Sequence, residues 1–123
     1  MSLTSGFFNS VNGDRTYNAD QFTSMFDGVV IDGVFGSYGD SFNVTPGSGL
    51  GVIVGTGRAW FNHTWSYNDA PINIALASAS SSGSRYDAIV LKVDTTDTVR
   101  ANSIEVISGS TAVSPVKPHW TVL

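Results

Sequence analysis

The sequence predicts a mainly β protein: an antiparallel β-sandwich or curled sheet of about seven short strands, with one short helix near the N-terminus. Three observations support this prediction. Short apolar runs recur at close spacing between turn signals rich in Gly, Pro, Asn and Asp. A central aromatic stretch, residues 55–63, lies between two strand-like runs, and a single segment has helical spacing. At 123 residues, the chain is expected to form one domain spanning residues 1–123.

The helical pattern covers residues 17–26. Asn18 suits an N-cap, and Gln21 follows three residues later, as a capping box requires. One apolar face with spacing i, i+3 and i+4 is made by Phe22, Met25 and Phe26. Gly28 favours a helix stop. We expect this helix to cover a sheet.

The first strands are predicted around turn signals in residues 29–49. Asp32 and Gly33 separate residues 29–31 from residues 34–35, which is a hairpin or turn pattern. Residues 42–44 alternate as a strand does, and residues 46–49 form a further turn.

The central stretch joins two strands at residues 50–54 and 72–76. Gly55 and Gly57 allow a positive φ or a kink between strands. Trp60 and Phe61 follow as large aromatic side chains on a pleated surface, where we expect them to enter the core.

The C-terminal half contains two further strands after a Ser/Ala-rich loop at residues 77–83. Residues 85–94 include a run that is apolar on both faces, at residues 88–91, which predicts an internal strand. Residues 103–107 predict a last strand with one wet face. From about residue 109 the chain reads as a proline-containing tail.

Charged residues on these strands predict one structural ion pair. Arg85 and Asp87 flank Tyr86, while Arg58 and Arg100 are expected on neighbouring strands. We therefore expect Asp87 to pair with an arginine across the sheet, where such a pair would set strand register.

The composition excludes several classes of function. Charged residues make up 13% of the chain and the net charge is −4, with no basic cluster, so nucleic acid and anionic membranes are poor partners. The absence of cysteine excludes disulfides and thiolate sites. No apolar run could span a bilayer and no signal peptide is visible, so we expect synthesis in a cytoplasm. A surface this poor in charge suits either an assembly subunit or a neutral monomer.

No catalytic, cofactor or metal site is predicted. The histidines, His63 and His119, lie far apart among aromatic residues, and a metal site would need a third ligand. The sequence has no Gly-x-Ser-x-Gly motif. Its carboxylates occur mostly in turn signals, where Asp accepts backbone hydrogen bonds. The sequence neither shows nor forbids the facing carboxylate pair of a glycosidase.

Aromatic residues provide the candidate binding site. The candidate contacts for a partner or a glycan are Trp65, Tyr67 and His63. A sugar-stacking platform could be formed by Trp60, Phe61, Trp65, Tyr67 and Tyr86, because flat rings match pyranose faces. The simpler interpretation, in which Trp60 and Phe61 are core while Trp65 and Tyr67 cover a sheet edge, is favoured.

Taken in order, several segments resemble a known family. They are residues 5–10 (Ser-Gly-Phe-Phe-Asn-Ser), 14–19, 22–35, 57–62 (Gly-Arg-Ala-Trp-Phe-Asn) and 85–94, followed by Arg100 and Gly109. Nearly the whole chain thus resembles the N-terminal domain of tail-fibre, receptor-binding or upper-baseplate proteins of tailed phages and prophages of Gram-positive bacteria. Its structural signature falls on Gly57, Arg58, Trp60, Arg85, Asp87 and Arg100.

The resemblance implies a non-catalytic virion component at the tail tip, assembled in the host cytoplasm. Such a domain would anchor a fibre or receptor-binding module to baseplate subunits, and a homotrimer is the expected oligomer. Family members usually continue into a host-binding head, whereas this sequence ends at Leu123. Host-surface glycans would then be bound by a C-terminal module.

Two rival functions stay open. A carbohydrate-binding module would use the region from Trp60 to Tyr67 to recognise host cell-wall polysaccharide. A wall-degrading enzyme would need two carboxylates, or a histidine with a carboxylate, in a shared cleft.

Overall fold

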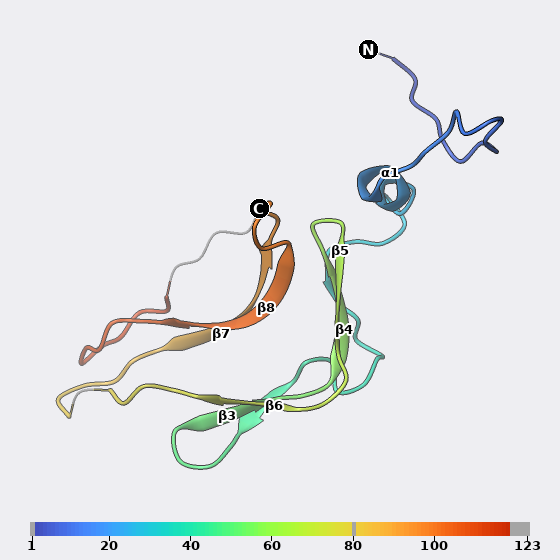
Figure 1. Ribbon diagram of the computed structural model, residues 1–123. Helices are drawn as coiled ribbons and strands as arrows, with labels where there is room; N and C mark the ends of the chain where they lie inside the picture. The colour runs from blue at the N-terminus through green and yellow to red at the C-terminus, as the bar shows by residue number, and fades with distance from the viewer. Residues whose placement is uncertain (1, 80, 119–123) are drawn as a thin grey trace.

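The computed structural model describes residues 2–79 and 81–118 and confirms a mainly β fold with one short helix. Eight strands form three antiparallel sheets, and they do not close into a barrel (Figure 1). His119, Ser80 in the predicted 77–83 loop, and the end of the predicted tail lie outside the described residues.

Helix α1 (Ala19–Ser24) begins where the sequence predicts. The Asn18 Oδ1 atom accepts a hydrogen bond from the Gln21 N–H at 2.9 Å, and Gln21 Oε1 accepts from the Asn18 N–H at 3.0 Å, which confirms the capping box. No residue of α1 is buried, so the expectation that this helix covers a sheet is wrong. Phe26, beyond the end of the helix, packs instead against the buried Trp60 ring of the body.

The first sheet has the order β1-β4-β5 and contains β1 (Gly33–Val34), β4 (Gly57–Phe61) and β5 (Thr64–Asn68). The predicted hairpin at residues 29–35 is wrong, because β1 pairs with β4 and places Gly33 opposite Trp60. The Asp32 carboxylate accepts the Asn62 N–H at 3.3 Å, which holds this segment against the β4–β5 turn instead.

The second sheet has the order β2-β3-β6 and contains β2 (Val44–Pro46), β3 (Gly51–Val54) and β6 (Ile72–Ala75). The turn predicted at residues 46–49 is confirmed, since the Gly47 N–H donates to the Gly51 carbonyl at 2.9 Å. The strand predicted from residue 42 begins only at Val44, because Ser41 and Phe42 have positive φ angles of 55° and 54°.

The chain passes from the second sheet to the first through Gly55 and Gly57. The predicted kink is present, but neither glycine has a positive φ. Glycine is needed at both positions because Asp40 and Phe42 pack directly against the Gly55 and Gly57 backbone. A Cβ atom on Gly57 would lie 2.8 Å from the Phe42 backbone nitrogen, and one on Gly55 would lie 2.8 Å from the Asp40 Cβ.

The third sheet is a long hairpin of β7 (Asp87–Asp94) and β8 (Ala101–Ser108). In Figure 1 it curves inside the corner that the first two sheets form. The alternating exposure of β8 confirms its wet face. The prediction that residues 88–91 form an internal strand is wrong: within the described residues, β7 pairs with β8 alone and is half-buried against the corner.

Very little of this fold is buried. The apolar core of the described chain consists of Val54, Ala59 and Trp60. The accessible surface is 9332 Å², whereas a compact monomer of this mass exposes roughly 6,300 Å². The chain therefore leaves an unusually large surface uncovered.

Candidate functional site

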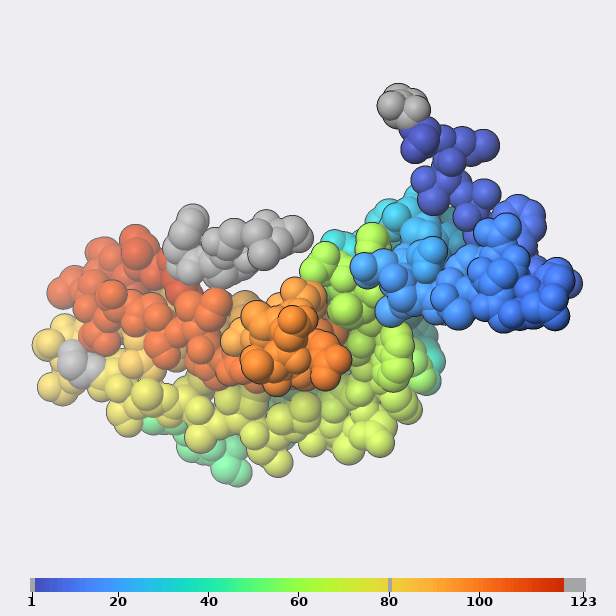
Figure 2. Space-filling view, turned by 45° about the horizontal axis from the view of Figure 1, so that its top comes forward, coloured from blue at the N-terminus to red at the C-terminus, as the bar shows by residue number. Residues whose placement is uncertain are grey.

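Residues 2–31, here called the N-terminal arm, are ordered by local contacts. The Tyr17 hydroxyl accepts the Phe8 N–H at 2.8 Å, and the rings of Phe7 and Tyr17 meet edge to face with centroids 5.2 Å apart. Figure 2 shows the arm projecting from one side of the body. The arm is thus a folded projection rather than part of the corner.

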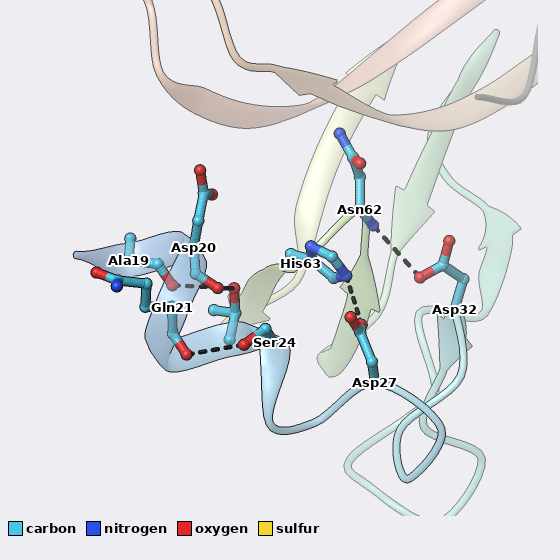
Figure 3. Close-up of polar contacts among 9 residues, drawn as sticks. Ala19, Asp20, Gln21, Ser24, Asp27, Asp32, Asn62 and His63 are labelled. Carbon is cyan, nitrogen blue, oxygen red and sulfur yellow. Dashed lines mark hydrogen bonds and ion pairs between the residues drawn. The ribbon is translucent and has the colours of Figure 1, made fainter. Parts of the chain in front are cut away.

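The arm joins the body at the tip of the β4–β5 hairpin. The ring of Phe26 lies 5.7 Å from the buried Trp60 ring, centroid to centroid. Beside it, His63 Nε2 lies 2.5 Å from Asp27 Oδ1 (Figure 3). Both side chains of this ion pair are about half exposed. His63 therefore contacts the arm, and its predicted role as a partner or glycan contact stays a prediction.

A second group of residues lies on the outer face of the same hairpin; we call it the aromatic platform, made of Tyr38, Arg58, Trp65 and Tyr67. The Arg58 guanidinium stacks 3.9 Å from the Tyr67 ring centroid and 4.9 Å from that of Tyr38. Trp65 is 70% exposed and Tyr67 47% exposed. Trp, Tyr and Arg are the residue types that dominate binding hot spots.

Contacts within the aromatic platform also shift the pKa values of its two tyrosines. Hydrogen bonding from Arg58 lowers the pKa of Tyr38, because the cation favours the ionised phenol. Hydrogen bonding with Tyr38 raises the pKa of Tyr67. The two tyrosines that stack on the same arginine therefore have pKa values shifted in opposite directions.

A groove of about 670 Å³ separates β5 from β8 and the turn before β8. Its apolar wall includes Ile72, Leu91 and Ile104, while Asn68 and Arg100 add polar groups. At one wall, Asn102 Nδ2 donates to Thr64 Oγ1 at 3.0 Å and to Ser66 Oγ at 2.8 Å. These bonds connect the third sheet to the first.

The predicted ion pair of Asp87 exists, but its partner differs from the expectation. Arg85 Nε donates to Asp87 Oδ1 at 2.8 Å, so the pair lies within one segment and does not cross the sheet to Arg58 or Arg100. Residues i and i+2 of an extended segment share one face, which brings the two side chains together. The Arg85 guanidinium lowers the pKa of Asp87.

The other signature residues serve the fold. Gly57 forms the close approach to Phe42, Trp60 is core, and Arg100 has a positive φ of 45° in the turn that precedes β8. Sequence reasoning missed Asp27 and Tyr38. Both sit in ordinary turn segments, and no local pattern relates them to His63 or Arg58.

Neither the groove between β5 and β8 nor the smaller pocket beside Val54 and Ile89 is lined by His63 or Asp27. Among residues 2–79 and 81–118, no three His, Cys, Asp or Glu side chains are grouped as metal ligands would be. In the same part of the chain, no helix has the length and apolar character that crossing a membrane requires.

Comparison of the chain with protein-family models, with curated proteins and with solved structures finds no match. The likeness to phage tail proteins therefore depends on the sequence segments quoted for it.

Proposed function

We propose that this protein is a non-catalytic structural subunit of a phage or prophage tail tip, which anchors a fibre or receptor-binding module to the baseplate. The observation that supports the proposal is the uncovered surface: roughly 3,000 Å² more than a compact monomer of this mass would expose. Subunits that are stable only in an assembly expose such surface when they are separated.

Many of the exposed side chains are large and apolar, which suits a surface that other subunits cover. Monomeric proteins rarely expose contiguous apolar patches of more than a few hundred Å². Here the exposed large hydrophobic residues include, on the arm, Leu3, Phe7, Phe8, Val11, Phe22, Met25, Val29 and Ile31. The platform and the C-terminal segment add Trp65, Tyr67, Val113 and Val116. Contact with other tail subunits would cover these groups.

The test measures assembly and binding together. Light scattering on the purified chain gives its mass, for which we expect a homotrimer, and cross-linking to the distal tail protein tests the anchoring role. A chain that stays monomeric and binds no tail component contradicts the proposal. Trp65→Ala should weaken tail binding without affecting folding, because the side chain is 70% exposed.

A second candidate function, carbohydrate binding, is favoured by the aromatic platform. Two exposed rings, Trp65 and Tyr67, lie on one face of β5 beside Arg58, which could bind a sugar hydroxyl. A glycan array containing cell-wall polysaccharides tests this function, with Trp65→Ala as the loss variant and Val113→Ala as the control. Absence of signal with the unmodified chain rejects it.

A further inference from the structure

The apolar face of α1 and its C-cap Met25 is only partly covered by the described residues: the Phe22 ring lies 5.9 Å from the rings of Phe7 and Phe26, centroid to centroid, and the rest of the face is open. Phe22 and Met25 are each 54% exposed, and no residue of the helix is buried. Isolated helices of this length are unstable in water, so packing against a partner is needed to hold one. The arm therefore presents an apolar face that a binding surface must complete.

The groove between β5 and β8 offers such a surface. Its volume of about 670 Å³ falls within the range of ligand-sized sites, and Ile72, Leu91 and Ile104 line it. Ala19 and Asp20 of the same chain reach its rim, whereas Phe22 and Met25 do not line it. The chain's own helix thus begins beside the groove, and its apolar side chains do not enter it.

The excess accessible surface of the chain indicates that another copy of the same chain fills the groove. Obligate homo-oligomer interfaces bury about 2,000–5,000 Å² in total, half of it on each partner. The excess of roughly 3,000 Å² per chain matches two such interfaces on every copy. A copy with one donor face and one acceptor groove makes two different contacts, and such head-to-tail contacts form a ring where the rotation between copies closes and an open filament where it does not.

We propose that the N-terminal arm of each copy docks on the next copy of this chain, with Phe22 and Met25 seated in the groove between β5 and β8. This inference rests on the proposed function and gives it a mechanism: arm exchange closes a cyclic assembly. Each copy has a net charge of −4 and only 13% charged residues, so charge attraction between identical copies is not expected and apolar burial drives the contact.

The donor test uses light scattering on the full chain carrying Phe22→Ser and Met25→Ser. Both positions are exposed, so folding should persist, as circular dichroism would check. We expect the mass to fall from oligomer to monomer. The matched control is Leu50→Ser with Tyr86→Ser, which removes two apolar side chains of similar exposure (56% and 49%) outside the arm and the groove and should leave the oligomer intact.

The acceptor test fills the groove with Ile72→Trp, at a partly exposed residue of β6 that forms part of its apolar wall. This variant should also be monomeric. Mixing it with the donor variant then leaves one intact arm and one intact groove, and the mixture should form a heterodimer and nothing larger. Formation of that dimer supports arm exchange specifically.

The outcomes separate the two proposals. An oligomer that survives both the donor and the acceptor changes overturns arm exchange, while the proposed assembly function stands. A full-length chain that is monomeric at high concentration also overturns arm exchange. It overturns the proposed function as well only if the chain fails to bind the distal tail protein.

Discussion

The Phe26 ring packs edge to face against Trp60, with centroids 5.7 Å apart and planes at 64°. This contact links the N-terminal arm to one of the few buried side chains of the body. The neighbouring Asp27–His63 ion pair spans the same junction, but its side chains are about half exposed. Apolar burial should therefore contribute more to holding the arm than the ion pair does.

Replacement of Phe26 tests this ranking. Phe26→Ala should lower the free energy of unfolding by about 2 kcal/mol, roughly half the loss for a fully buried ring, because Phe26 is half-buried. Asp27→Asn should lower it by much less. Urea unfolding followed by tryptophan fluorescence measures both, and Phe8→Ala, at an exposed ring, is the control. Equal losses for Phe26→Ala and Asp27→Asn would contradict the ranking.

Gly57 should not tolerate a side chain. Gly57→Ala would place a Cβ atom 2.8 Å from the Phe42 nitrogen, so the backbone must shift, and we expect a loss of about 1–3 kcal/mol. Gly33→Ala is the matched control, because a Cβ atom there meets nothing within 4 Å. The melting temperature of Gly57→Ala should be clearly lower than that of Gly33→Ala. Similar melting temperatures would show that the segment around Phe42 can move to make room for the added Cβ atom.

The free energy of unfolding should depend on pH through the ionisation of the Asp87 carboxyl. Arg85 lowers the pKa of this carboxyl in the folded state, so its contribution is present above the unfolded pKa of about 3.9 and is lost as the pH falls through the lower folded value. Between about pH 5 and pH 2, the free energy of unfolding should fall less in Asp87→Asn and in Arg85→Met than in the unmodified chain.

Lys92→Met provides the control for that experiment. Its ammonium lies 3.9 Å from Asp94 and is largely exposed, and Thr96 contributes more than Lys92 to the lowered pKa of Asp94. The acid dependence of this variant should therefore stay close to that of the unmodified chain. If Arg85→Met behaves like Lys92→Met, the Arg85–Asp87 pair does not stabilise the fold.

The pKa values of the tyrosines in the aromatic platform should change when Arg58 or Tyr38 is replaced. Because the guanidinium lowers the pKa of Tyr38, Arg58→Met should raise that pKa towards its ordinary value of about 10. Tyr38→Phe should lower the pKa of Tyr67, which Tyr38 raises. Ultraviolet titration of tyrosinate measures both changes. Arg15→Met is the control, since Arg15 stacks on Phe8 and not on a tyrosine.

Local chemistry was readable from the sequence. The capping box of Asn18 and Gln21, the turn at residues 46–49 and most strands follow from patterns within a few residues. The platform was found in part, because alternation along β5 puts Trp65 and Tyr67 on one face. Tyr38 was missed because its contact with Arg58 joins segments 20 positions apart.

The sequence alone determined that this is a β protein with one capped helix, since turn residues and side-chain periodicity act over short distances. Only the tertiary structure decided that β1 pairs with β4, that Asp87 binds Arg85, and that the helix face and the groove stay open. Strand partners and exposure result from competition among distant segments for the same edges and faces. Periodicity shows which side chains share a face, but it does not show what covers that face.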